Sequence, residues 1–386
     1  MLELIFWGAI SIVIYTYLGY PALASLLAWI IRRRTSNYSQ LSPLEDANLP
    51  TVTLIIAAYN EESIIAKKLE NSLALDYPRN KLEIVVAADG STDRTCEIVR
   101  QYTQYGVTLH WQPERRGKAA ALNRVVPLTK GEIIVFSDAN AMYDKEALRK
   151  LVRHFANPKI GCVAGAKKIS QKSVTGAGEG LYWRYESHLK QCDTLIGSMM
   201  GAPGEIFAIR RDLYEPVEED SLIEDFIISM RIIAKGYKAV YEPEAISWEE
   251  ASSSLKGEWQ RRTRISAGGI QAILRLKGML NPSRGRLAFQ YLSHRVLRWV
   301  ITPWLLPLGL IINTFLAYKT PYNWLLIGQL LFYGGALIGW LGAYLGKLWF
   351  PFYFIFYFCM LNAAAIVGCL KYLTGRQPVA WSKARE

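Results

Sequence analysis

Three short polar clusters in the first half of the chain each follow an apolar run. They are AAYNEE at 57–62, AADGSTDRT at 87–95 and SDAN at 137–140. Any one of them could be an ordinary turn, because Asp-Gly is common in tight turns and Ser or Thr can cap a helix. Together at one edge of a sheet they would form a site, since ligands of open α/β sheets bind beyond the carboxyl ends of the strands.

The side chains in and near these clusters suit an anionic ligand. Asp89 could accept hydrogen bonds from a base or ribose, and Tyr59 could stack on a base ring. Asp138 and Asn140, two residues apart at the end of a strand, offer hard oxygen ligands to Mg²⁺ or Mn²⁺, which would bridge a diphosphate. Lys118 follows a glycine at the start of a helix, where its ammonium and the backbone N–H groups can both meet phosphate. The alternative for Lys118 is a solvated lysine in the first helical turn.

The elements that must position these side chains alternate between short apolar runs and helical patterns, which indicates an α/β sheet. Leu54–Ile56 and Ile84–Val86 are continuous aliphatic runs, as a sheet covered on both faces requires. We expect strands at 51–57, 82–88, 107–111, 132–137 and 160–164, and helices at 62–75, 93–105, 117–129 and 144–156.

Composition narrows the class of protein. The chain has 386 residues, 51% of them hydrophobic, and a net charge of +12, which excludes a disordered chain. The excess of Lys and Arg lies at 260–386 and directly after the first apolar run, so we expect anionic lipid and not nucleic acid as a partner. Five cysteines without a CxxC pair and four scattered histidines argue against a disulfide framework and a zinc site.

Four uncharged runs predict membrane spans. Leu4–Ile31 is longer than the roughly 20 residues that cross a bilayer, and Arg32–Arg34 follow it. This order predicts a signal anchor with the following residues in the cytosol, and not a cleaved signal peptide. Trp299–Tyr318, Pro321–Gly346 and Leu348–Leu370 predict three more spans. Counting the spans in order places the C-terminal tail outside, whereas its Lys and Arg residues favour the inside. The alternative to three full spans is that one of the runs is re-entrant.

A further helical pattern at 259–280 combines apolar spacing with Arg and Lys. It predicts a helix that lies on the inner leaflet, or else a packed amphipathic helix of the soluble domain. The expected organisation is an anchor at 1–34, a linker at 35–49, a cytosolic α/β domain at 50–258, an interfacial segment with an RxxR motif at 259–298, three spans at 299–372 and a basic tail at 373–386.

The ordered set of motifs resembles a family 2 glycosyltransferase with a GT-A fold. The resemblance runs from about Thr51 to Ile270, and the flanking spans are similar to those of cellulose, hyaluronan and poly-N-acetylglucosamine synthases. It implies a Rossmann-like mixed sheet inserted between transmembrane helices. Its motifs are AAYNE, AADGSTD, RGKAAALN at 116–123, SDAN, GAPGEIFAIRR at 201–211, the acidic pair of LIEDF, and RRTRI at 261–265.

The resemblance also implies roles for individual residues. Asp138 and the residue two positions later correspond to the DxD motif that binds metal and diphosphate. Asp225 corresponds to the catalytic base, and adjacent Glu224 could raise its pKa. Arg261 and Arg264 fall on QxxRW-like positions that clamp the diphosphate. With Lys118, the predicted nucleotide-sugar contacts are Tyr59, Glu61, Asp89, Lys118, Asp138, Arg261 and Arg264.

Two positions depart from the family pattern. Asn140 stands at the second acidic position of the DxD motif, and an amide oxygen binds a cation more weakly than a carboxylate. Ile265 stands at the tryptophan position of the QxxRW motif and Arg261 at its glutamine position. The missing aromatic platform for an acceptor sugar disfavours processive synthesis.

These observations predict an inverting membrane glycosyltransferase that depends on a divalent cation, Mg²⁺ or Mn²⁺. It would move a sugar from a nucleotide diphosphate sugar, with a UDP-sugar favoured, to a lipid-linked or glycan acceptor at the inner face of a bacterial-type plasma membrane. A processive exopolysaccharide synthase is the alternative. A sugar-nucleotide pyrophosphorylase would begin with a glycine-rich loop, where this domain begins AAYNEE. A binding protein without activity is the remaining alternative, suggested by Asn140.

Overall fold

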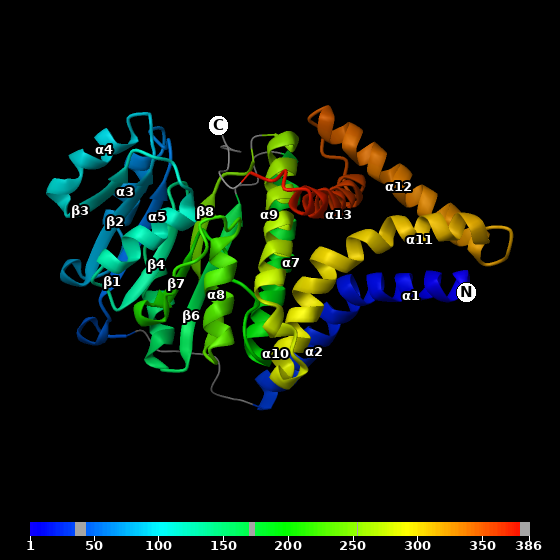
Figure 1. The fold of residues 1–386 in the computed structure, drawn as a ribbon, viewed down its shortest axis with the longest axis horizontal. Coiled ribbons are helices and arrows are strands. Elements are labelled where there is room, and N and C mark those ends of the chain that lie inside the picture. The colour runs from blue at the N-terminus through cyan, green and yellow to red at the C-terminus, as the bar shows by residue number, and fades with distance from the viewer. Residues whose placement is uncertain (35–43, 170–173, 253, 379–386) are drawn as a thin grey trace.

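The computed structural model describes residues 1–34, 44–169, 174–252 and 254–378. Figure 1 shows an α/β domain on one side of the molecule and a group of long helices on the other, with α7 and α9 standing between them. Within the described ranges, eight strands form one sheet in the order β3-β2-β1-β4-β7-β6-β8-β5. The strands are β1 (Val52–Ala58), β2 (Leu82–Asp89), β3 (Val107–Gln112), β4 (Ile133–Asp138), β5 (Met142–Tyr143), β6 (Ile160–Ile169), β7 (Phe207–Arg210) and β8 (Lys238–Glu249).

The sheet is mixed, as the resemblance implied. Strands β1 to β4 are parallel, with Leu54 of β1 opposite Ile84 of β2 and Val135 of β4. Strand β7 is antiparallel to both β4 and β6. The five strands predicted from the sequence are present as β1 to β4 and β6. The four predicted helices contain α3 (Ile65–Leu73), α4 (Thr95–Gln101), α5 (Lys118–Val125) and α6 (Ala147–Val152).

Both faces of the sheet are covered, which explains the continuous aliphatic runs. Leu54 packs into one core with Ile65 of α3, whereas Ile55 packs into a second core with Leu122 of α5. All four side chains are at most 1% exposed. Successive residues of a strand point to opposite faces, so a strand buried on both sides must be apolar at every position.

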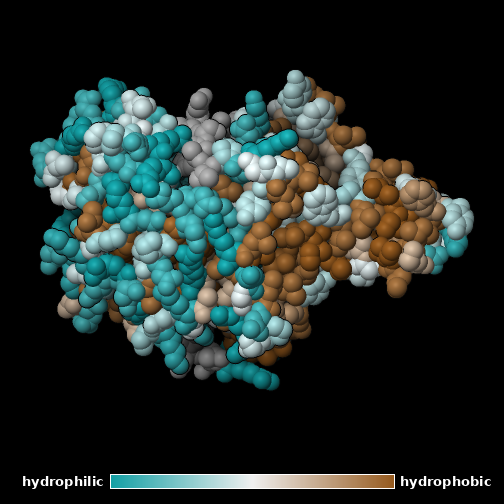
Figure 2. Space-filling model, in the orientation of Figure 1, coloured by the Kyte–Doolittle hydropathy of each residue, from teal (hydrophilic) through white to brown (hydrophobic). Residues whose placement is uncertain are grey.

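Within the described ranges, four helices are long and apolar enough to cross a membrane, in agreement with the four predicted runs. Figure 2 shows that hydrophobic residues dominate the visible surface of this part of the molecule, whereas the α/β domain is mostly hydrophilic. The helices are Leu2–Arg34 (α1, Leu2–Ile14, and α2, Tyr20–Arg34, joined by a π turn), Arg286–Leu316 (α10, Arg286–Tyr291, a π segment Leu292–Ile301, and α11, Thr302–Leu316), α12 (Tyr322–Tyr344) and α13 (Phe352–Leu373).

Helix α9 (Leu255–Arg275) connects the two parts of the molecule. A Cβ atom added at Gly268 of α9 would meet Ile223, which precedes α8 (Glu224–Ala234), and one at Gly269 would meet Trp299 of the π segment. On another face α9 packs against α13, which Figure 1 shows nearly end-on while α1, α11 and α12 run across the view. The predicted helix at 259–280 is therefore present, and it packs on both parts.

The predicted linker at 35–49 falls mostly outside the described residues, as does the tail after residue 378. Helix α7 (Val174–Ile196), which was not predicted, packs on α2. Tyr20 of α2 donates a 2.5 Å hydrogen bond to Asp193 of α7, and Ser25 lies 2.8 Å from His188. These contacts join the first membrane helix to the α/β domain.

The closest approach of α13 to α9 occurs at Gly368 and gives a first prediction. A Cβ atom at this position would lie 2.5 Å from the carbonyl oxygen of Thr263 and 2.9 Å from the amide nitrogen of Ala267. The Gly368→Ala variant should therefore push the helices apart and lower the unfolding free energy by about 1–3 kcal/mol, measured as a lower melting temperature in detergent.

Gly328 of α12 provides the matched control, because a Cβ atom there would meet nothing within 4 Å. Alanine favours a helix over glycine by up to about 1 kcal/mol, so Gly328→Ala should leave the melting temperature unchanged or raise it. Equal effects of the two substitutions would show that the contact between α9 and α13 does not contribute to stability.

Candidate active site

A cavity of about 1350 Å³ lies beyond the carboxyl ends of β1, β2 and β4 and extends to α7, α8, α9 and the π segment before α11. The three polar clusters thus meet at one sheet edge, because the strands that precede them are parallel neighbours. All ten residues predicted as site residues line this cavity, namely Tyr59, Glu61, Asp89, Lys118, Asp138, Asn140, Glu224, Asp225, Arg261 and Arg264.

Asp89 holds the loop that leads into α5. Its carboxylate accepts hydrogen bonds from the backbone N–H groups of Arg116 (3.0 Å) and Gly117 (2.7 Å) and from the side chain of Gln112 (2.6 Å). Gly117 has φ of +99°, a conformation that glycine adopts without strain, and the next residue begins the helix. Asp89 therefore positions the start of α5, whatever contact it makes to a nucleotide.

Tyr59 has a neighbour that the sequence did not indicate. The Arg115 guanidinium lies over its ring, 3.6 Å from the centroid. Cations favour the face of an aromatic ring, and a planar guanidinium can stack there as a base would. One face of Tyr59 is thus covered by arginine, and the pair forms a flat wall at this end of the cavity.

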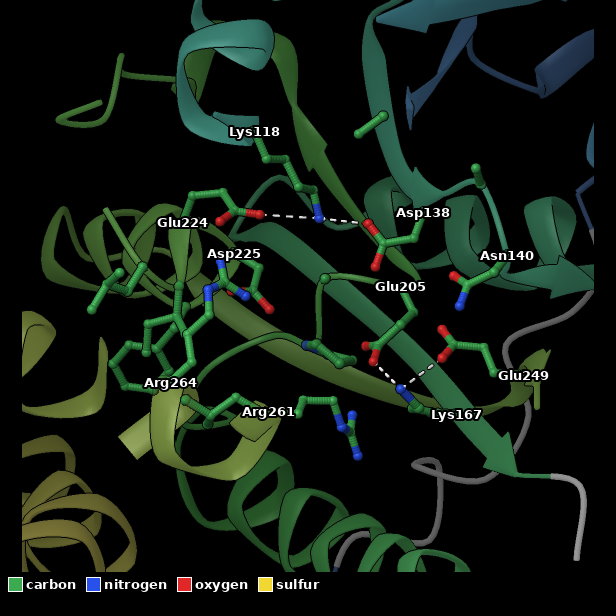
Figure 3. Close-up of a pocket in the computed structure, with 18 of the residues that line it drawn as sticks. Lys118, Asp138, Asn140, Lys167, Glu205, Glu224, Asp225, Glu249, Arg261 and Arg264 are labelled. Carbon is green, nitrogen blue, oxygen red and sulfur yellow. Dashed lines mark hydrogen bonds and ion pairs between the residues drawn. The ribbon is translucent and has the colours of Figure 1, made fainter. Parts of the chain in front are cut away.

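Lys118 lies between two acidic side chains at the centre of the cavity. Its ammonium is 2.7 Å from Asp138 Oδ1 at the end of β4 and 3.0 Å from Glu224 Oε1 at the start of α8, as Figure 3 shows. Burial opposes the charge of Lys118, but Asp138, Glu224 and Asp225 together hold its pKa well above the usual value. A Cβ atom at Gly204 would lie 3.1 Å from both the Lys118 ammonium and Asp225 Oδ2, so a larger residue there would press on both charged groups.

Asp225 is poised to titrate near neutral pH. Burial raises its pKa to about 7, the negative charge of Glu224 adds to the shift, and Lys118 opposes it. Proton transfer by a carboxylate is most efficient when its pKa is close to the working pH. The carboxyl group lies on the first turn of α8 and lines the same cavity as Lys118 and Asp138.

The two predicted arginines occupy different places. Arg264 lies beside Glu224 and Asp225 in Figure 3, and burial lowers its pKa although these two carboxylates and Asp138 oppose the shift. Arg261 forms ion pairs with Glu179 of α7 and, at 3.1 Å, with Glu258. Arg264 is therefore close to the acids at the centre of the cavity, whereas Arg261 is held by acids of α7 and α9.

The sequence matches the family described as "Glycosyltransferase like family 2" over residues 50–268, more than half of the chain. The chain belongs to glycosyltransferase family 2.

Relatives of this glycosyltransferase include two synthases and a solved transferase. Poly-beta-1,6-N-acetyl-D-glucosamine synthase of Staphylococcus aureus is 30% identical over 274 residues, 67% of this chain and 66% of the relative. The synthase of the same name from Staphylococcus epidermidis is 28% identical over 263 residues, 66% of this chain and 63% of the relative. The chain thus matches slightly less than two thirds of the length of these relatives.

A solved structure extends the similarity to the membrane helices. A mannosyltransferase from Pyrobaculum calidifontis, in complex with GDP-Man and Mn²⁺, is 25% identical with a TM-score of 0.73. The superposition covers 97% of this chain and 100% of the mannosyltransferase. The GT-A fold predicted from the motifs is therefore confirmed, together with helices on both sides of the catalytic domain.

Sequence reasoning missed a second charged cluster in the cavity of this glycosyltransferase. Lys167 at the end of β6 pairs with Glu205, which precedes β7, and lies 2.9 Å from Glu249 at the end of β8 (Figure 3). Glu205 belongs to the GAPGEIF segment, which was the one available signal. Lys167 and Glu249 come from strands that bring them to the cavity only in the folded chain.

The donor atoms at the centre fit a divalent cation shared with a ligand. Asp138 and Asn140 lie side by side in Figure 3, and their oxygens are of the type that Mg²⁺ and Mn²⁺ prefer. Burial raises the pKa of Asp138, Lys118 opposes this, and Glu205 and Glu249 add negative charge. Among the described residues, no group of three or more His, Cys, Asp and Glu could enclose a metal by itself, so water or a bound ligand would supply the remaining donor atoms.

The central position of Lys118 gives a second prediction. The Lys118→Met variant leaves Asp138 and Glu224 close together without their shared cation, so the unfolding free energy should fall by roughly 3 kcal/mol. The measurement is the midpoint of thermal unfolding of the purified protein in detergent at neutral pH.

Arg116→Met is the control for this variant. Arg116 also forms a 2.7 Å ion pair, with Glu219, but both side chains are about half exposed, at 53% and 47%. Exposed pairs contribute about 0–1 kcal/mol, so this variant should unfold close to the wild-type midpoint. Similar midpoints for the two variants would contradict a central role of Lys118 in stability.

Proposed function

We propose that this glycosyltransferase transfers a sugar with inversion from a nucleoside diphosphate sugar to an acceptor at the membrane surface. One observation carries the proposal: the Asp225 carboxyl group, with a pKa raised to about 7, lines the same cavity as Lys118, Asp138 and Arg264. A base that can take a proton near neutral pH thus adjoins cations that suit a leaving diphosphate.

In the proposed reaction an acceptor hydroxyl attacks the anomeric carbon of the donor sugar. Asp225 takes the proton of that hydroxyl as the new glycosidic bond forms and the bond to the diphosphate oxygen breaks on the opposite face. Lys118 and Arg264 stabilise the charge that develops on the departing diphosphate. A divalent cation held by Asp138 and Asn140 would supply further positive charge to the same group. Glu224 keeps the pKa of Asp225 high and holds Lys118 in place.

The proposal for the donor names a class of molecule, the nucleoside diphosphate sugars. The UDP-sugar favoured from the sequence is the first candidate, and GDP-mannose is the second because the mannosyltransferase that matches 97% of this chain is in complex with GDP-Man. Tyr59 and its Arg115 partner form the wall on which the base would lie, and Glu61 and Asp89 border it. Arg261, held by Glu179 and Glu258, contributes to the diphosphate site by its charge and not by direct contact.

We infer that the catalytic domain lies at the inner face of the membrane. Arg32, Arg33 and Arg34 end α2, and the positive-inside rule assigns that end to the cytosol. Lys371 and Gln377, at and after the end of α13, line the same cavity as Asp225, so the tail is on the side of the catalytic domain. We propose that α13 lies along the membrane interface, packed against α9. The helices Leu2–Arg34, Arg286–Leu316 and α12 would cross the membrane. The anchor at 1–34, the catalytic domain at 50–258 and the interfacial segment that follows it are part of this proposal.

The test of the proposed base is the Asp225→Asn variant. A general base contributes roughly 10²–10⁴-fold to a rate, so transfer from a labelled nucleotide sugar in the presence of Mn²⁺ or Mg²⁺ should fall by at least about 100-fold. The wild-type rate should rise with pH through about 7, because Asp225 accepts a proton only when ionised, and this acidic limb should vanish in the variant.

Asp220→Asn is the matched control for this test. Asp220 precedes the same helix, but its side chain is 59% exposed and pairs with Arg275 at 2.7 Å. Its amide variant should retain the wild-type rate and the acidic limb. Full activity of the Asp225 variant would remove the assignment of the base and leave the fold assignment intact.

A second candidate function is processive polysaccharide synthesis. The synthases of the two staphylococci favour it, and Ile265 in place of an aromatic residue disfavours it. We expect transfer of a single sugar, so gel or mass analysis of products from labelled donor should give one added residue per acceptor at any time of incubation. A ladder that lengthens with time would identify the chain as a polymerase.

A further inference from the structure

The membrane-side wall of the cavity contains a buried lysine without a counter-ion. Lys190 of α7 lines the cavity and is only 3% exposed. Among the described residues, no hydrogen bond or ion pair reaches its ammonium group. Its surroundings are aromatic, with the ring centres of Trp183 at 5.5 Å and Tyr241 at 6.0 Å. A lysine is almost never fully buried unless it is paired, so this side chain requires an explanation.

Two of the acids near Lys190, Glu186 and Glu205, are paired with other cations. Glu186, one turn earlier on α7, lies 2.7 Å from Arg295 and 2.8 Å from Arg298. Glu205 pairs with Lys167. The single charge of Glu186 is therefore shared by two guanidinium groups, and Lys190 has only the longer-range attraction of Glu186, Glu205 and Asp225. This wall of the cavity carries a surplus of positive charge, in contrast to the acidic centre around Lys118.

The excess positive charge on this wall is unfavourable for the free energy of the protein without a ligand. An ionised ammonium group loses hydration when it is buried, and the rings of Trp183 and Tyr241 replace that interaction only in part. Burial lowers the pKa of Lys190 to about 8, Arg295 adds to this shift, and Glu186, Glu205 and Asp225 oppose it. The group therefore remains mostly protonated at neutral pH. A bound anion would cancel both the cost and the local charge, and such a contact is a charge-assisted hydrogen bond, the strong kind.

The position of Lys190 assigns that anion to the acceptor and not to the donor. The predicted contacts to the nucleotide, such as Tyr59, lie beside the strand ends and Arg261 and Arg264 lie on α9, whereas Lys190 is on α7, which packs on α2. Arg295, its cationic neighbour, belongs to the π segment that continues directly into α11. Arg295 also lies over the rings of Trp299 at 5.1 Å and of Phe226, next to Asp225, at 5.7 Å.

We propose that Lys190 binds the phosphate group of a lipid-linked acceptor, so that the acceptor enters from the membrane beside the π segment and presents its hydroxyl to Asp225. This inference rests on the proposed function, because it assumes that the cavity binds an acceptor. A lipid phosphate is the anion that fits a cationic wall formed by elements continuous with membrane helices.

The experiment measures binding to the full chain in detergent micelles. The probes are a polyprenyl phosphate and the uncharged polyprenol of the same length, which differ only in the phosphate. The wild type should bind the phosphate roughly 10- to 100-fold more tightly, the range expected for a hydrogen bond to a charged group. Lys190→Met should abolish this preference, and Lys190→Arg should keep most of it. Lys159→Met, which removes an exposed charge between α6 and β6, should keep all of it.

Several outcomes would overturn the proposal. The proposal is wrong if Lys190→Met retains the preference for the phosphate. It is also wrong if binding that depends on Lys190 is seen only with inorganic phosphate or with a glucuronate-bearing oligosaccharide. The melting temperature of Lys190→Met without ligand should stay equal or rise, because a buried unpaired charge is removed. A fall in melting temperature together with lost binding would indicate a structural role. Binding is measured without sugar transfer, so a failure here is distinct from a failure of the Asp225 test.

Discussion

The ammonium group of Lys118 is the interaction on which the geometry of the cavity depends. It reaches Asp138 at the end of β4 and Glu224 at the start of α8, while its own residue begins α5, so one cation joins three elements. Two acids this close together in a buried place require such a partner. Burial is the main cause of the raised pKa of Asp225, and the opposing effects of Glu224 and Lys118 adjust it further.

The charges at the centre explain why a cation belongs to the proposed reaction. Five carboxyl groups line this part of the cavity, and the cations facing them are fewer, so this part of the cavity is acidic. A nucleoside diphosphate adds further negative charge, and a divalent cation offsets both. Asn140 in place of a second aspartate reduces the electrostatic repulsion of a diphosphate. An amide oxygen would also bind the cation more weakly than a carboxylate would. The acids are Asp138, Glu205, Glu224, Asp225 and Glu249, and the facing cations are Lys118, Lys167 and Arg264.

The sequence predicted those features that depend on residues near each other in the chain. Runs such as Leu54–Ile56 identified the parallel strands, and their order brought the predicted site residues to one edge. Strand β8 was missed because polar residues interrupt it where its register with β6 shifts between Gly165 and Ala166. The partner of Arg261 lies 82 residues away and that of Lys167 lies 38 residues away, so neither pair could be deduced before the fold was known.

The side of the membrane on which the C-terminal tail lies could not be predicted from the sequence either. It also relates the cavity to the membrane. Counting apolar runs assumes that each one crosses the bilayer, and it places Lys371 on the far side from the catalytic domain. Because α13 packs on α9 and Lys371 lines the cavity, α13 does not have to cross the bilayer, and the count of crossings no longer applies. The cavity then has an acidic centre beside the strands and a cationic wall beside the membrane helices. An electrically neutral acceptor would gain nothing from that wall, whereas the charge of an anionic one would be held at the wall and away from the acidic centre, which leaves its hydroxyl group free to reach Asp225.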